Sequence, residues 1–186
     1  MIEGTLVDLR AVEMTDMERY TLWFNDPEVT RFLNRRYQFS LAAEEAWLRE
    51  NTGKPLSYDH VAFAIDTKDG VHIGSIAFHS ASPENRCAEL GITVGDKAYW
   101  SRGYGTDAMR TLLRFGFDEM NLYRIELTVD ARNERAQACY RKCGFVEEVR
   151  LRQHRFAEGA YHDTLWMGLL RDEWAAAQQA GGEVRR

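Results

Sequence analysis

The N-terminal third of the chain shows one alternating stretch followed by helical patterns. Residues 5–10 alternate polar and apolar positions, which predicts a first strand. Over residues 15–25 the apolar side chains recur at three- and four-residue spacing, and Pro27 then opens a second short helix. A serine caps a third helical pattern over residues 40–50. The pattern therefore predicts a strand, then helices, then a loop at 51–59.

From residue 61 onward the pattern predicts strands interrupted by helices. The predicted elements are strands at 61–65, 71–79 and 89–94, a helix at 105–120, a strand at 124–129, a short helix at 134–143, and a hairpin of strands 145–156 and 161–170. The middle strands and the last strands follow one another without helical crossovers. We therefore expect a mixed α/β (α+β) fold and not a doubly wound parallel sheet. The residues after Trp174 are expected to be frayed or disordered.

The composition is that of one soluble globular domain. The chain has 186 residues, 45% of them hydrophobic, and a formal net charge of −5, which argues against nucleic-acid binding and leaves room for a cationic amine. No window is apolar enough to span a bilayer and no secretory signal is expected, so cytoplasm is the default. The cysteines (Cys87, Cys139, Cys143) form no CxxC pair, so we expect neither disulfides nor a metal site. Cys139 and Cys143 are expected to pack as small apolar groups.

The stretch WSRGYGTDAM, residues 100–109, carries the first candidate chemistry. A dinucleotide fingerprint needs G-x-G-x-x-G, but Ala108 replaces the third glycine, and no Walker-type loop is present. Two interpretations stay open on this stretch alone. It is either a glycine-containing helix start or a pyrophosphate cradle, in which backbone N–H groups of residues 102–106 and the helix N-terminus face an anion.

A second motif, N-x-x-A-x-x-x-Y-x-x-x-G-F at residues 133–145, favours the pyrophosphate cradle over the plain helix start. Here the chain resembles the GNAT superfamily of acetyl-CoA-dependent N-acetyltransferases, whose R/Q-x-x-G-x-G/A signature is similar to the glycine stretch. Residues 156–163 are similar to the G-x-Y-x-D hairpin of the branch with ribosomal-protein N-terminal and spermidine acetyltransferases. The resemblance covers residues 5–172 and departs from the family at Trp100, where Arg or Gln is usual.

The resemblance implies an architecture and a cosubstrate. It implies one acetyltransferase domain over residues 5–172, a tail at 173–186, and a mostly antiparallel central sheet, splayed in the middle and flanked by helices. Acetyl-CoA would be the cosubstrate. The implied cofactor-binding residues are Ile92, Thr93 and Val94, whose unpaired backbone groups receive the pantetheine, then Arg102, Gly103, Tyr104, Gly105 and Thr106 at the pyrophosphate, and Asn133, Ala136 and Arg141 on the following helix.

The resemblance also implies the catalytic groups. Tyr140 would protonate the departing thiolate, although an isolated tyrosine here would otherwise be read as packed with its hydroxyl on a carbonyl. Glu89 is the candidate general base, directly or through water, with His79 as the alternative; a surface carboxylate explains Glu89 equally well. Asn133 also suits a plain N-cap, and Arg141 and Lys142 suit solvated helix-end charges.

The acceptor of the acetyl group is left open. A protein N-terminus, a polyamine, an amino sugar or an antibiotic would each supply a primary amine. The acidic residues Asp26, Glu28, Glu44 and Glu45 of the N-terminal helices would either attract a cationic amine or form a solvated face. A non-catalytic acyl-CoA-binding or sensing module is the alternative function. The resemblance is compatible with a homodimer, which no residue by itself supports.

Overall fold

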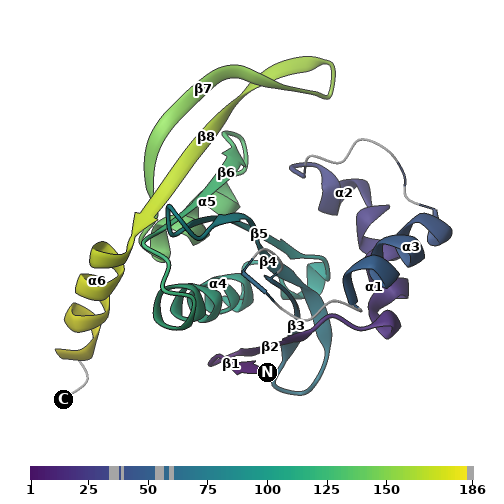
Figure 1. Cartoon of the computed structure of the whole chain (residues 1–186). Helices are drawn as coiled ribbons and strands as arrows, with labels where there is room; N and C mark the ends of the chain where they lie inside the picture. The colour runs from purple at the N-terminus through teal and green to yellow at the C-terminus, as the bar shows by residue number, and fades with distance from the viewer. Residues whose placement is uncertain (34–37, 39, 53–56, 59–60, 184–186) are drawn as a thin grey trace.

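The fold is built on one mixed sheet. The computed structural model describes residues 1–33, 38, 40–52, 57–58 and 61–183. Within this part the strands are β1 (Ile2–Glu3), β2 (Val7–Ala11), β3 (Val61–Thr67), β4 (His72–Ser82), β5 (Cys87–Val94), β6 (Arg124–Asp130), β7 (Val146–Ala157) and β8 (Ala160–Leu170). They form an 8-stranded sheet in the order β1-β2-β3-β4-β5-β6-β8-β7 (Figure 1). Among the described strands β5 and β6 are parallel and every other neighbouring pair is antiparallel, which confirms the predicted fold class.

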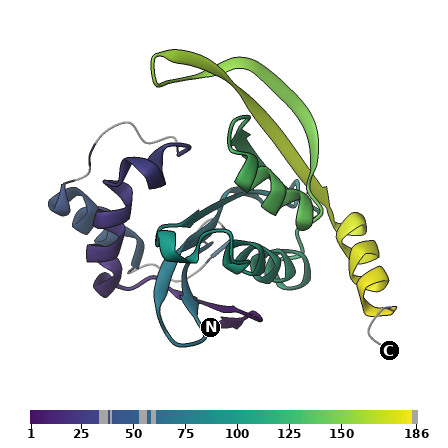
Figure 2. The same cartoon turned by 180° about the vertical axis from the view of Figure 1, so that it is seen from behind.

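The helices gather in separate groups around the sheet. They are η1 (Met14–Asp16), α1 (Met17–Phe24), α2 (Pro27–Thr30), α3 (Leu41–Thr52), η2 (Lys97–Tyr99), α4 (Tyr104–Arg114), the π-helical turn η3 (Phe115–Glu119), α5 (Glu134–Lys142) and α6 (Arg171–Glu183). Helices α1, α2 and α3 lie together at one side, and α4 and α5 at the other (Figures 1 and 2). No helix in the described ranges is long and apolar enough to cross a membrane.

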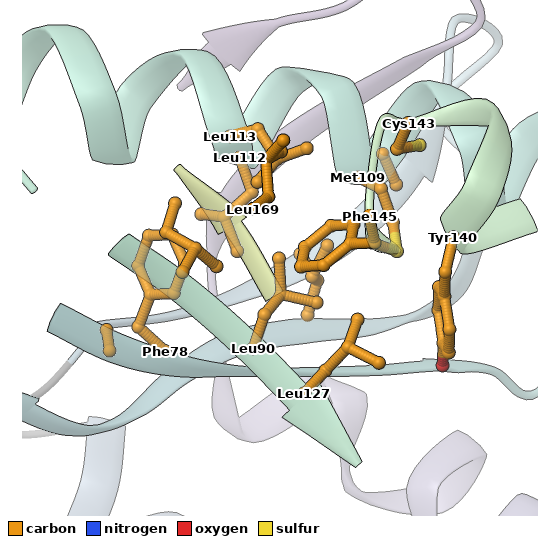
Figure 3. Packing of buried hydrophobic residues seen from close by; sticks show 14 of the residues in the cluster. Phe78, Leu90, Met109, Leu112, Leu113, Leu127, Tyr140, Cys143, Phe145 and Leu169 are labelled. Carbon is orange, nitrogen blue, oxygen red and sulfur yellow. The ribbon is translucent and has the colours of Figure 1, made fainter. Parts of the chain in front are cut away.

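The main core lies between α4 and the sheet. The apolar side of this helix is buried: Met109, Leu112, Leu113 and Phe117 have no exposed surface. Figure 3 shows Met109, Leu112 and Leu113 packed over the strands. The regular helix ends at Arg114, earlier than predicted, and the chain continues through η3. At Gly116 an added Cβ would lie 2.7 Å from the Phe78 ring, so only glycine permits this close approach to the sheet.

The last helix corrects the prediction for the C-terminal tail. Residues up to Glu183 form α6 and are not disordered, because Trp174 packs on Phe117 with ring centroids 5.9 Å apart. The Glu173 carboxylate accepts a hydrogen bond from the Leu170 N–H at 2.9 Å and starts the helix. The short strand β1 was also not predicted, since two residues carry no periodic signal. The remaining predicted elements are present within a few residues of their expected bounds, and residues 53–56 and 59 of the expected loop lie outside the described part.

The closing hairpin arches from the sheet toward α2 (Figure 1). Its turn falls at Glu158 and Gly159, as predicted. The Arg155 guanidinium donates to the Phe32 carbonyl at 2.8 Å and to the Leu33 carbonyl at 2.5 Å. The hairpin therefore fixes the position of the segment that follows α2.

Candidate active site

The sheet opens between β5 and β6. The two strands pair only from Cys87 to Glu89 on β5, with Arg124 to Glu126 on β6 as partners. Beyond this point β5 continues to Val94 paired with β4 alone, while β6 continues to Asp130 paired with β8 alone. The edge of β5 after Glu89 is thus not joined to β6, which confirms the expected splay.

A cavity of about 970 Å³ lies at this opening. Residues of α1, α2 and α3 form one side of it, β4 and β5 the floor, and the glycine loop with α5 the other side. The expected site residues that line it are Glu89, Ile92, Thr93, Val94, Gly103, Gly105, Thr106, Asn133, Ala136 and Tyr140. Side chains far apart in the sequence therefore meet in one space large enough for a ligand.

The N-terminus of α4 faces this cavity without a capping side chain. Gly103 holds φ at 91° at the N-cap, a conformation that favours glycine, and no side chain accepts from the first turn. The nearby carboxylate of Asp107 is engaged elsewhere, since it accepts from the N–H groups of Leu6 and Val7 at 2.7 and 3.0 Å. The positive end of the helix is left for an anion.

Three expected cofactor contacts lie outside the cavity lining. The Arg102 guanidinium donates to the Ala98 carbonyl at 3.2 Å and lies 6.0 Å from the centre of the Tyr104 ring. Arg141 donates to Gln137 Oε1 at 3.1 Å. Neither side chain nor Tyr104 is part of the lining, whereas Lys142 is. The positions of these side chains give no support to a direct role for the side chains of Arg102, Tyr104 or Arg141, whereas the Lys142 cation of α5 does line the cavity.

Trp100 occupies a position that the sequence left unexplained. Its indole Nε1 donates to the Val94 carbonyl at 2.6 Å, so the expectation that this carbonyl is free is wrong. The Arg135 guanidinium stacks over the indole, 3.7 Å from the ring centre. Both residues line the cavity. A positive charge therefore lies against residue 100, supplied by Arg135 of α5. Only the fold reveals this pairing, because the two residues are 35 positions apart.

Tyr140 reaches the cavity from α5 through a largely buried position. Its side chain descends from the helix toward the strands, beside Phe145 and Leu127 (Figure 3). Only 9% of the residue is exposed, and its hydroxyl makes no hydrogen bond to any described residue. Burial, with smaller contributions from Cys139 and Cys143, raises the pKa of Tyr140 well above its ordinary value. The phenol therefore stays protonated at neutral pH.

Glu89 lies where the strands part. It is directly opposite His79 on β4 and opposite Glu126 on β6, in the last pair before the opening. Its Oε1 accepts a long hydrogen bond, 3.5 Å, from Thr128 Oγ1. His79 lines the cavity as well. Among the described residues no cation pairs with Glu89, so its charge faces the cavity.

Asn133 caps α5, as its simpler interpretation predicts. Its Oδ1 accepts from the Ala136 N–H at 3.1 Å. The residue also lines the cavity, so the cap and a contact with a ligand are compatible.

A hydroxyl and thiol cluster was missed by sequence reasoning. Thr106 Oγ1 lies 3.3 Å from Cys139 Sγ, and Cys143 Sγ lies 3.8 Å from the Thr106 carbonyl oxygen. A hydrogen bond from the Cys143 thiol lowers the pKa of Cys139 to about 7, and the same contact raises the pKa of Cys143. The four-residue spacing of the cysteines placed them on one helix face, but their contact with the glycine loop required the tertiary structure.

The acidic residues of the N-terminal helices are mostly engaged with cations. Lys97 Nζ lies 2.8 Å from Asp26 Oδ2 and 2.9 Å from Glu28 Oε2. Glu45 pairs with Arg49 on the same helix at 2.7 Å. The Glu44 side chain lies outside the described part. Of these acids only Glu28 lines the cavity.

Comparisons relate the chain to known proteins. A family model described as an acetyltransferase (GNAT) domain matches residues 7–146. The uncharacterized N-acetyltransferase p20 of Bacillus licheniformis is 28% identical over 168 residues, 90% of this chain and 94% of that protein. Spermidine N(1)-acetyltransferase of Escherichia coli (strain K12) is 30% identical over 116 residues, 62% of each chain. The structure of spermidine N-acetyltransferase from Vibrio cholerae in complex with CoA and spermine aligns with a TM-score of 0.82 at 23% identity, covering 91% of this chain and 98% of that one.

Proposed function

The chain belongs to the GNAT acetyltransferase family, and on that premise we propose that it moves an acetyl group from acetyl-CoA to a primary amine by direct attack in a ternary complex. The observation that carries the proposal is the opening between β5 and β6, which places Glu89 and Tyr140 in the same cavity as the uncapped N-terminus of α4. The spermidine N-acetyltransferase of Vibrio cholerae, which shares this fold, was solved in complex with CoA.

The residues present fit acetyl-CoA. The edge of β5 from Ile92 to Thr93 offers backbone groups that pantetheine amides pair with as an added strand would. The N–H groups of residues 104–106, with the helix dipole, suit a pyrophosphate. Arg135 on Trp100 and Lys142 add positive charge to the cavity wall. When bound, acetyl-CoA supplies an acyl group activated as a thioester.

The described side chains divide the proton movements between them. Glu89, directly or through water, takes a proton from the ammonium form of the acceptor, because only the free amine attacks; His79 opposite it is the alternative base. The free amine attacks the carbonyl carbon, and as the C–S bond breaks the nitrogen loses its second proton to solvent, from which the Tyr140 hydroxyl is afterwards reprotonated. Tyr140 donates a hydrogen bond and then its proton to the sulfur, whose thiol pKa is about 8.5. The raised pKa of Tyr140 guarantees the protonated state but weakens it as an acid, so hydrogen bonding supplies part of its effect.

The Tyr140→Phe variant tests this function. We expect its turnover with any amine accepted by the wild type to fall by about 10²- to 10³-fold, because the proton donor is lost. Its acetyl-CoA dissociation constant, measured by calorimetry, should stay within about twofold, since the ring remains. Tyr123→Phe is the control, because Tyr123 is 43% exposed and lies outside the cavity lining.

Two outcomes contradict parts of the proposal. Unchanged turnover in Tyr140→Phe would remove Tyr140 from the acid role. A wild-type protein that binds acetyl-CoA but releases no thiol with any amine of a broad panel would favour the non-catalytic acyl-CoA-binding module instead.

A further inference from the structure

The side of the cavity formed by the N-terminal helices is strongly apolar. The residues that line it there are Val12, Tyr20, Phe24, Val29, Phe32, Leu33 and Trp47. They lie across the opening from the glycine loop and α5, where the anionic cosubstrate fits. This half of the cavity is the space left for the acceptor, and its surface matches an apolar group.

The carboxylates beside this apolar wall are already neutralised. Lys97 holds both Asp26 and Glu28, and the two carboxylates raise the pKa of the Lys97 ammonium. The negative charge of Glu28 also acts on Arg135, opposing the lowering of the pKa of Arg135 that burial causes. The charges of Asp26 and Glu28 are therefore balanced by those of Lys97 and Arg135. Asp26 and Glu28 are thus not free to receive a second ammonium group.

The far end of the wall carries an excess of positive charge. Arg31 and Arg132 lie 5.3 and 5.7 Å from the centre of the Phe32 ring, and both pair with Glu158. Arg155 lies beside the Phe32 carbonyl and pairs with the buried Asp130 at 3.6 Å. Three arginines and two carboxylates gather here outside the cavity lining, and the net positive charge next to Phe32 disfavours a polycation.

One charge on the floor of the cavity stays unbalanced. Glu28, Glu89 and Glu134 are the carboxylates that line it within the described residues. Glu28 is held by Lys97, and Glu134 is exposed in the first turn of α5, on the opposite wall. Glu89 alone lies on the sheet below the apolar wall.

From this distribution we infer that the acceptor is a monoamine with an apolar body of about aromatic size, and not a polyamine. Its amine lies at Glu89 and its body packs against Phe24, Val29, Phe32 and Trp47. A second ammonium group would lose its hydration among apolar side chains without gaining an unpaired carboxylate from the part of the chain that the structure describes. The inference rests on the proposed transfer function and narrows its acceptor. An arylalkylamine and a peptide N-terminus with a large apolar first residue share this chemistry.

An acceptor panel with the wild-type protein tests the inference. Thiol release and product mass are measured with phenethylamine, n-butylamine, spermidine, and tetrapeptide amides that begin with Phe or with Gly. We expect kcat/KM for phenethylamine to exceed that for n-butylamine by about 30-fold, from burial of the ring, and spermidine not to exceed n-butylamine. If the Phe-initiated peptide exceeds phenethylamine, the source is a peptide N-terminus; the reverse order indicates a small arylalkylamine.

Other outcomes separate the two proposals. Spermidine as the best acceptor, or equal use of phenethylamine and n-butylamine, overturns the monoamine inference and leaves the transfer function intact. No thiol release with any member overturns the monoamine inference, whereas the transfer function is overturned only if no amine of the broad panel gives thiol release.

Variants of the apolar wall and of Lys97 sharpen the test. Phe32→Ala should lower kcat/KM for phenethylamine about tenfold more than kcat/KM for n-butylamine, because the aromatic ring loses more contact than the butyl chain. Phe156→Ala is the control, because Phe156 is 43% exposed on the hairpin and outside the lining. If Phe32→Ala fails to fold, Trp47→Ala, at a residue 43% exposed, repeats the measurement.

The Lys97→Met variant is expected to shift the acceptor preference toward spermidine. It frees Asp26 and Glu28, so use of spermidine should rise about tenfold relative to phenethylamine. If the ratio of kcat/KM for spermidine to kcat/KM for phenethylamine stays unchanged, the pairing of Lys97 with Asp26 and Glu28 does not select the acceptor.

Discussion

Tyr140, Glu89 and Trp100 show how single side chains acquire their roles from their surroundings. Tyr140 keeps its proton because burial raises its pKa, and Glu89 keeps its charge directed into the cavity because no described cation pairs with it. Trp100 is uncharged, yet it carries the Arg135 guanidinium on its ring. The family resemblance implied the first of these roles and suggested the second, and no sequence signal indicated the third.

At the residue scale, the alkylation rate of Cys139 tests where the cosubstrate binds in the cavity. Its pKa of about 7 predicts that alkylation by iodoacetamide accelerates as the pH rises from about 6 to about 8, because the thiolate is the reactive form. Since Cys139 lines the cavity, saturating acetyl-CoA should slow this alkylation by about tenfold or more. Cys87, which lies outside the lining, is the internal control, and mass spectrometry of the peptides separates the two sites. Equal protection of both cysteines would contradict the placement of the cosubstrate.

At the element scale, the first turn of α4 combines ordinary helix geometry with an unfilled anion site. Gly103 is needed for its left-handed backbone, whereas Gly105 has helical geometry inside α4. A Cβ added at Gly105 would have Val94 Cγ2 as its nearest neighbour outside the helix backbone, at 3.5 Å, an ordinary contact. The protein itself therefore has no steric need for glycine at residue 105.

Gly105→Ala is thus expected to separate stability from binding. Its melting temperature should stay equal or rise slightly, because alanine is favoured over glycine in a helix by about 0.5–1 kcal/mol. Its acetyl-CoA affinity, measured by calorimetry, should fall by about tenfold or more, because the methyl group obstructs the approach of the phosphates. Gly103→Ala should lower both quantities, since φ is 91° there. Unchanged affinity in Gly105→Ala would place the pyrophosphate elsewhere.

A cluster of charged side chains connects the turn η1 to the sheet. The Asp16 carboxylate accepts two hydrogen bonds from Arg10, each at 2.8 Å, and one from the Glu13 N–H at 2.9 Å. His72 Nδ1 lies 3.2 Å from Asp16 Oδ1. Burial opposes ionisation of Asp16, but these hydrogen bonds outweigh it and lower its pKa below 3.8. Arg10 also bonds Asp66 of β3, so the cluster joins the start of α1 to β2 and β3.

Removing the Asp16 carboxylate should lower the free energy of unfolding by an amount that depends on pH. A lowered folded-state pKa stabilises the protein above the unfolded-state pKa, and the contribution is lost as the pH falls through the folded value. Asp16→Asn should lower the free energy of unfolding by about 2 kcal/mol near neutral pH, and the difference from wild type should shrink below about pH 4. Urea denaturation at several pH values measures both. A deficit that does not change with pH would assign the effect to packing. Glu18→Gln, at an exposed position of α1, is the control.

At the scale of the whole molecule, the cavity is assembled from parts that are distant in the sequence. Helices α1 to α3 form one wall and α5 with the glycine loop the other, and the hairpin joins the first wall to the rest through Arg155. Helix α6 packs on η3 through Trp174 and does not contribute to the cavity lining.

Trp174→Ala is therefore expected to affect stability and not the site. Trp174 is 8% exposed, and truncating a buried tryptophan costs about 3 kcal/mol or more through lost contacts and a cavity. Chemical denaturation should show this loss of stability. Under conditions in which the variant is still folded, its acetyl-CoA affinity should stay within about twofold of wild type. Gln178→Ala, at an exposed position of α6, should change neither quantity. A parallel loss of affinity would mean that α6 supports the cavity.

The sequence by itself determined the order and type of nearly all the elements, because hydrophobic periodicity, caps and glycines act locally. Asn133 as a cap, Gly144 as a helix end and the turn at Gly159 each depend on neighbours within a few residues. It also determined the family resemblance through the spacing of the glycine loop and the Asn133 to Phe145 motif.

Only the tertiary structure decided which side chains meet. Lys97 with Asp26 and Glu28, Arg135 with Trp100, Thr106 with Cys139, and Trp174 with Phe117 are contacts between distant segments. They depend on how elements pack and on which rotamers that packing leaves, and no local pattern encodes them. The same holds for Arg102 and Arg141, whose charges suggested phosphate contacts but whose side chains lie outside the cavity lining. The charge balance from which we infer the acceptor is therefore a property of the fold.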